Sequence, residues 1–146
     1  ILSINLKSMY FCSRAAAPIM IAQHQGKIVN TASMGGMRPQ PMTAAYCASK
    51  AAVTSLTLSL AKELVEHNIQ VNAVCPGMID TNMWADIDRC GGALTGQTAY
   101  MQSRIQGIGM KRAGTPDEVA ALYAFLASSD SDYITGEAFK IDGGVW

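Results

Sequence analysis

Apolar residues near the start of the chain recur at the spacing of a helix that ends at about Gln25 and Gly26. Five of them fall near one helical face: Ile4, Met9, Phe11, Ala15 and Ile19. Such a stripe is typical of an amphipathic helix packed on a core. No N-capping residue precedes it, and we therefore expect the chain to begin inside an element, as a fragment of a longer protein would.

Three short segments predict strands, over residues 27–32, 69–75 and 138–142, each ended by glycine or proline. The first is expected to be buried because it is short and β-branched. A long helix is expected over about residues 43–67. Its expected apolar stripe consists of Ala48, Ala51, Ala52, Leu56, Leu60 and Leu64. Residues 33–42 are expected to form a loop, and residues 78–114 show no single period.

A further helix is predicted to run from Thr115 to about Ser128. Thr115 suits the N-cap, Pro116 the first helical position and Glu118 the third. Strands alternating with helices are typical of a parallel sheet covered on both faces. Because ligands bind beyond the carboxyl ends of such strands, the residues that follow them are the candidates for chemistry.

Composition limits the classes of function. The 146 residues are 49% hydrophobic and only 15% charged, with eleven basic and eleven acidic side chains. This suits one globular domain and excludes disorder, and the balance of charge argues against nucleic-acid binding. The longest apolar run, residues 15–22, is too short to cross a membrane and contains Pro18. So few charges suggest that another subunit or more chain covers part of the surface.

The four cysteines are Cys12, Cys47, Cys75 and Cys90. None forms a C-x-x-C pair, and with only two histidines in the chain no metal site is predicted. No secretory signal is recognisable. We expect reduced thiols in a cytoplasmic protein.

Tyr46 and Lys50 are four residues apart on the long helix and therefore share a face. By itself this pair is more readily explained as a solvated contact. A phenol has a pKa of about 10, and lowering it by about three units requires about 4 kcal/mol in favour of the phenolate. One ammonium at about 4 Å supplies roughly that energy at an effective dielectric of about 20. Ser33 either caps a glycine-rich turn or donates to a substrate oxygen beside the phenol.

Five motifs resemble those of the short-chain dehydrogenase/reductase family. They are Asn5 within residues 4–7, Ser33 within 29–33, Tyr46 to Lys50, residues 71–77 with Thr81, and residues 142–144. Their order and spacing agree throughout, but they cover only the second half of the family's fold. The resemblance implies an α/β fold: the second half of a doubly wound Rossmann-type parallel sheet with helices on both faces, the N-terminal half missing, in one partial domain over residues 1–146.

The resemblance also implies a catalytic tetrad of Asn5, Ser33, Tyr46 and Lys50, with Tyr46 as general acid and base. Asn5 would hold a water that links Lys50 to solvent, and Lys50 would also bind the nicotinamide ribose. The implied cofactor-binding residues are Tyr46, Lys50, Pro76, Gly77, Ile79 and Thr81. The choice between NAD and NADP is left undecided, because the family's glycine-rich turn lies outside this sequence. The chain by itself is expected to be inactive and to bind the dinucleotide weakly.

A substrate lid is expected over about residues 78–114, although a helix pair packed on the core is an equal alternative. Its large side chains include Met83, Trp84, Ile87, Leu94, Tyr100 and Met101. Similarity to polyol, sugar-alcohol and acetoin/butanediol dehydrogenases favours a small secondary alcohol or ketone, with Gln40, Met83 and Trp84 as substrate residues. A 3-oxoacyl thioester or steroid-like ketone is the alternative.

A hypothesis of another class is an inactive association module. In the family, the helix carrying Tyr46 and the helix around Asn5 commonly pack against the same pair in a partner, which implies a homodimer or homotetramer. The small side chains on the long helix, Ala48, Ala51, Ala52 and Leu56, suit such close contact. Neither a nucleic acid nor a membrane is expected as a partner.

Overall fold

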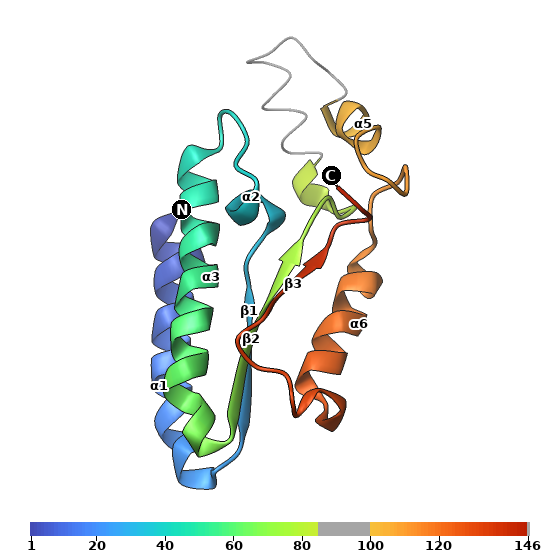
Figure 1. Ribbon diagram of the computed structural model, residues 1–146. Helices are drawn as coiled ribbons and strands as arrows, with labels where there is room; N and C mark the ends of the chain where they lie inside the picture. Colours follow the sequence, from blue (N-terminus) through green and yellow to red (C-terminus); the bar gives the residue numbers. More distant parts are fainter. Residues whose placement is uncertain (85–99, 146) are drawn as a thin grey trace.

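The computed structural model describes residues 1–84 and 100–145. They form a parallel sheet with α1 and α3 on one face and α6 on the other, which confirms the predicted α/β class (Figure 1). The elements are η1 (Ser3–Lys7), α1 (Ser8–Gln23), β1 (Gly26–Thr31), α2 (Met34–Met37), α3 (Ala44–Leu64), η2 (Val65–His67), β2 (Ile69–Pro76), α5 (Tyr100–Ile105), α6 (Pro116–Ala127), η3 (Ser129–Ser131) and β3 (Ala138–Ile141).

The sheet has the order β1-β2-β3, and both pairings are parallel. Thr31 at the end of β1 lies opposite Val74, and Pro76 at the end of β2 lies opposite Ile141. The carboxyl ends of all three strands therefore meet at one edge, where the candidate residues were expected. Within the described residues β1 has a partner strand on one side only, so its other side is a free sheet edge.

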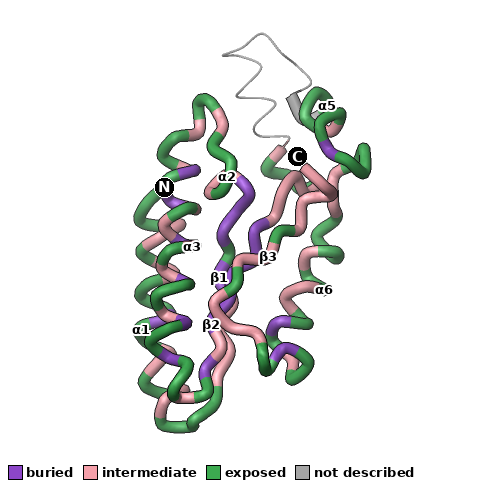
Figure 2. Tube along the Cα trace, in the orientation of Figure 1, coloured by how far each residue is buried: buried purple, intermediate pink, exposed green. Residues whose placement is uncertain are grey.

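The core lies between β2 and α3, and Figure 2 shows buried positions concentrated along β2. The buried positions of α3 are Cys47, Ser49, Val53, Thr57, Ala61 and Leu64. The predicted stripe is therefore wrong for Ala48 and Ala51, which are exposed, and right for Leu64. The reason is that hydroxyl groups occupy part of the buried line: Thr57 Oγ1 accepts from Asn30 Nδ2 at 3.0 Å and donates to the Val53 carbonyl at 2.9 Å.

The predicted apolar face of the first helix is wrong except at Met9. Ile4, Phe11 and Ile19 are 75%, 55% and 62% exposed. Met9 does pack on the core, together with four residues outside the predicted stripe, Leu6, Ala17, Met20 and Ile21. Apolar side chains thus occur on both sides of this helix, and Phe11 and Ile19 lie on the side turned away from the core. Residues 3–7 form a π-helical turn.

The start of α6 follows the prediction. Thr115 Oγ1 accepts the Glu118 N–H at 3.2 Å, and the Glu118 carboxylate accepts the Thr115 N–H at 2.8 Å. The Arg112 guanidinium also binds Glu118, and its hydrogen bond is the main cause that lowers the pKa of this carboxyl to about 2. One helix was not predicted: α2 lies in the expected loop. The helix α5 lies within the aperiodic segment, for which a helix pair was one of the two expectations.

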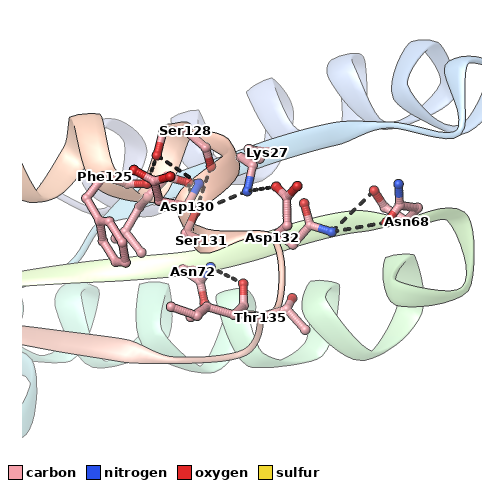
Figure 3. Close-up of polar contacts among 12 residues, drawn as sticks. Lys27, Asn68, Asn72, Phe125, Ser128, Asp130, Ser131, Asp132 and Thr135 are labelled. Atoms are coloured by element: carbon pink, nitrogen blue, oxygen red, sulfur yellow. Dashed lines mark hydrogen bonds and ion pairs between the residues drawn. The ribbon is translucent and has the colours of Figure 1, made fainter.

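Polar contacts fix the other end of the sheet, near the start of β1 (Figure 3). Lys27 Nζ donates to Ser131 Oγ at 3.0 Å and forms an ion pair with Asp132 at 2.8 Å. Asn72 Nδ2 donates to the Ile134 carbonyl, and Thr135 Oγ1 accepts the Val71 N–H. These bonds connect the segment between α6 and β3 to β1 and β2. They lie at the end of the sheet opposite the candidate site.

Candidate active site

Ser33 and Tyr46 lie on either side of Gly35. Ser33 ends the β1 segment, is 9% exposed and caps α2 by accepting the Gly35 N–H at 3.1 Å. A Cβ built on Gly35 would lie 3.1 Å from Tyr46 Cε1 and 3.5 Å from Ser33 Oγ. The hydroxyl from the sheet and the phenol ring from α3 therefore converge on one small space, which only a residue without a side chain leaves open.

Lys50 lies one turn further along α3, on the same side as Tyr46. Its Nζ is 6.0 Å from the centre of the Tyr46 ring and donates to the Thr31 carbonyl at 2.8 Å. Partial burial lowers the pKa of Lys50, and interaction with buried Cys75 acts in the opposite direction. The ammonium is thus held between the end of β1 and the phenol.

The lowered pKa of Lys50 makes stability depend on pH. The folded chain releases this proton at lower pH than the unfolded chain, so between the lowered value and the ordinary value of 10.5 the unfolded state binds more protons. Stability conferred at this position therefore rises with pH across that window. We expect the unfolding free energy of the unaltered full-length gene product to rise with pH relative to that of Lys50→Met across this window. Lys62→Met on the same helix is the control, and a pH-independent difference would contradict the burial of the charge.

Asn5 reaches α3 from the π-helical turn η1. Its Nδ2 donates to Ser49 Oγ at 3.1 Å, and Ser49 Oγ donates to the Tyr46 carbonyl at 2.6 Å. The structure therefore brings all four predicted tetrad residues to one region. Ser49 was missed by the sequence analysis, although its position three residues after Tyr46 is the spacing at which a helical hydroxyl reaches a backbone carbonyl.

The end of β2 carries two of the predicted cofactor-binding residues, Pro76 and Gly77. The Gly77 N–H donates to the Ile141 carbonyl at 2.9 Å. A Cβ on Gly77 would lie 2.8 Å from both Cα and Cβ of Asp142. The structure thus gives Gly77 a packing role against the end of β3, beside the predicted role of admitting a nicotinamide ring.

The other two predicted cofactor-binding residues, Ile79 and Thr81, come shortly after Gly77 in the sequence. Ile79 forms a parallel bridge with Gly114, and the Thr81 carbonyl accepts the Trp84 N–H at 3.1 Å. Both lie in the segment that leaves the carboxyl end of β2. Their backbone is held by these contacts, while the Thr81 side chain is exposed.

The predicted substrate residues come from two segments, the loop between α2 and α3 and the helical turn at residues 82–84. Gln40, between α2 and α3, accepts a hydrogen bond from Arg104 Nη1 of α5 at 2.9 Å, and its Nε2 donates to the Arg38 carbonyl at 3.3 Å. Arg104 was not predicted, because only the fold brings α5 to this loop. Met83 is 56% exposed. Ile87 and Leu94, the side chains of Tyr100 and Met101, and Cys90 lie outside the described residues.

The remaining sequence expectations concern thiols, metals and membranes. Cys12, Cys47 and Cys75 are free thiols, and the last two are buried. In residues 1–84 and 100–145, no three His, Cys, Asp or Glu side chains gather closely enough to hold a metal ion. No helix of these same ranges combines the length and apolar character needed to cross a membrane.

Comparison with known proteins agrees with this geometry. A family model described as enoyl-(acyl carrier protein) reductase matches residues 1–146. Galactitol 2-dehydrogenase of Agrobacterium fabrum is 41% identical over 100% of the chain and 58% of its own length. The 3-oxoacyl-[acyl-carrier-protein] reductase FabG of Thermotoga maritima is 38% identical over 99% and 55%. A crystal structure of NAD+-bound xylitol dehydrogenase matches with a TM-score of 0.93 at 35% identity, over 99% of this chain and 58% of that one.

A parallel α/β sheet with the candidate residues at its carboxyl edge is the arrangement in which such folds bind ligands. Together with the match over residues 1–146, it shows that the chain belongs to the short-chain dehydrogenase/reductase family. The chain spans about half the length of these relatives: 58% of the galactitol dehydrogenase and 55% of the reductase.

Proposed function

We propose that this chain is the catalytic half of an NAD(P)-dependent oxidoreductase that transfers a hydride between a nicotinamide and a small secondary alcohol or ketone. The observation that carries the proposal is the convergence of Ser33 Oγ and the Tyr46 ring on Gly35, with the Lys50 ammonium behind the ring. This is the arrangement that removal of a proton from an alcohol oxygen requires.

Tyr46 is the proposed general acid and base. In alcohol oxidation its phenolate takes the hydroxyl proton of the substrate, and in ketone reduction its phenol returns that proton. Lys50 favours the phenolate because a positive charge close to the ring stabilises a negative one. Ser33 already accepts a backbone N–H, so its own O–H is left to donate to the substrate oxygen and hold it beside the phenol.

The side chains present suit a nicotinamide nucleotide. Lys50 Nζ has three donors, of which one binds the Thr31 carbonyl, and the remaining donors and the Tyr46 hydroxyl suit ribose hydroxyl groups. The proposed contacts for the nicotinamide end lie at the same edge: Pro76 ends β2, and Gly77, Ile79 and Thr81 follow it. When bound, the nicotinamide accepts or supplies the hydride. NAD+ is present in the xylitol dehydrogenase structure, which supports this assignment.

We propose a polyol, sugar alcohol or vicinal diol, or the corresponding ketone, as the substrate. The resemblance to galactitol 2-dehydrogenase and xylitol dehydrogenase supports this class. Gln40 and its partner Arg104 place amide and guanidinium groups between the loop that precedes Tyr46 and α5. Polar groups of this kind match a substrate with several hydroxyls. Met83 and Trp84 lie near the start of the proposed lid over residues 78–114.

Two alternatives have support of their own. The resemblance to a 3-oxoacyl-[acyl-carrier-protein] reductase favours a 3-oxoacyl thioester as substrate. The exposed apolar side chains of the first helix, among them Ile4, Phe11 and Ile19, favour self-association through α1 and α3. A homo-oligomer is compatible with an enzyme, whereas a chain that only associates would have no turnover.

A substrate panel tests the proposal. The full-length gene product is assayed with sorbitol, 2,3-butanediol and a 3-oxoacyl thioester, each with NAD and with NADP, by nicotinamide absorbance. We expect turnover of a polyol or diol with at least one of the two nucleotides. Turnover of the thioester alone would establish the alternative reductase, and no turnover of any substrate would favour the association module.

A further inference from the structure

Ser49 has no place in the predicted tetrad, yet its hydroxyl touches two members of it. The side chain is completely buried, at 0% exposure. Buried hydroxyl groups are almost always hydrogen-bonded. Here Asn5 Nδ2 can only donate and the Tyr46 carbonyl can only accept, so the two bonds run in one direction, from the Asn5 amide through the Ser49 hydroxyl to the Tyr46 backbone.

The first turn of α3 is the part of that helix that most needs such support. The helix starts at Ala44, only two residues before Tyr46. Thr43 is the N-cap, but its side chain forms no capping bond to the N–H groups of this turn, all of which lie in the described part of the chain. Its hydroxyl instead donates to the Gln40 carbonyl at 2.9 Å. A helix end without a side-chain cap is held less firmly.

The π-helical turn supplies the missing anchor. Asn5 and Leu6 are half-buried, while their neighbours Ile4 and Lys7 are exposed. Leu6 packs on the cluster that contains Val53 of α3. The turn is thus fixed to the core by Leu6, and Asn5 next to it extends this fixed point to the first turn of α3. Isolated π-helical turns often occur at functional sites.

We infer that Ser49 is a positioning residue for Tyr46: its buried hydroxyl couples Asn5 to the Tyr46 backbone and holds the phenol against Ser33 and Lys50. The inference rests on the proposed function, since the position of the phenol matters only if Tyr46 moves a proton. It also assigns Asn5 a role through Ser49 that requires no contact with the substrate.

Two sets of measurements on the full-length gene product test this inference. The first is hydrogen–deuterium exchange, which does not depend on activity. Ser49→Ala is expected to speed exchange of amides in residues 44–50 and to leave residues 57–64 unchanged, whereas Ser55→Ala, an exposed serine of the same helix, changes neither. Unchanged exchange in residues 44–50 of Ser49→Ala would overturn the coupling.

The second set is kinetic. With the best substrate of the panel, Ser49→Ala is expected to lower kcat about tenfold while KM changes less than about twofold, because a small displacement of the reacting group slows the chemical step. Ser49→Cys, with a weak sulfur donor and acceptor, should retain more of kcat.

A double variant tests whether the two residues act together. Asn5→Ala/Ser49→Ala should lose no more of kcat than the worse single variant, since both residues act through one chain of bonds. A purely structural serine would lower the unfolding temperature and leave kcat of the folded enzyme unchanged, and additive losses would likewise refute the coupling. An inactive unaltered protein would refute the proposed function itself.

Discussion

Replacing Tyr46 with phenylalanine is expected to lower kcat of the full-length gene product by about 10²–10⁴-fold, the range typical of a lost general acid or base. The change removes one hydroxyl and keeps the ring that fills the space beside Gly35. Folding and subunit assembly should therefore be unaffected. Initial rates across pH and sedimentation of the purified variant measure the two properties separately.

The matched control for this variant is Tyr133→Phe. Tyr133 is fully exposed after η3, far along the chain from the site, and its hydroxyl should be dispensable. If Tyr46→Phe retained the turnover of the Tyr133→Phe control, Tyr46 would not be the proton donor. Loss of assembly together with loss of turnover would instead show that the Tyr46 hydroxyl is needed for subunit assembly.

Gly36→Ala is expected to destabilise the protein by about 1–3 kcal/mol, the usual range for overpacking. A Cβ on Gly36 would lie 2.7 Å from Ala51 N and from the Lys50 carbonyl carbon, and 3.0 Å from the Lys50 carbonyl oxygen. These are backbone atoms of α3, which cannot relieve the contact by rotating away as a flexible side chain can. Because the contact is with Lys50 itself, kcat should fall as well.

The sign of the Gly36→Ala effect is diagnostic. Helix propensity alone favours alanine over glycine by about 1 kcal/mol, so a loss of stability identifies the close contact between α2 and α3. Gly107→Ala is the control, because its nearest neighbour, the Arg104 carbonyl oxygen, would lie at 3.4 Å. Denaturant unfolding measures both variants. A Gly36→Ala protein as stable as the unaltered one would contradict the packing of α2 on α3 at this point.

The strands and the start of α6 could be predicted because their signals are local. A β-branched run bounded by glycine specifies a strand, although β1 is mostly half-buried and not buried as expected. Thr115, Pro116 and Glu118 meet the requirements of one helix end. The convergence of Ser33 and Tyr46 at one edge followed from the parallel topology, since strand ends in such a sheet meet on the same side.

The errors arose where local patterns and tertiary packing differ. The first helix carries apolar residues on two sides, and periodicity alone does not say which side packs: Ile4 and Phe11 face outward, whereas Leu6 and Met9 pack on the core. On α3, Ser49 and Thr57 are buried because each finds a distant amide partner, Asn5 or Asn30, and polarity alone predicts exposure for such residues. The Gln40–Arg104 contact joins residues 64 positions apart, which no sequence period can indicate.

Transfer of a label tests the central claim most directly. The full-length gene product is incubated with an oxidised nicotinamide nucleotide and the preferred alcohol carrying deuterium on its carbinol carbon, and the reduced nucleotide is analysed by mass spectrometry. Direct hydride transfer, assisted by proton removal at Tyr46, predicts one deuterium in each reduced nicotinamide and none in the solvent. Reduced nucleotide without the label, or no reduced nucleotide at all, would contradict the assignment.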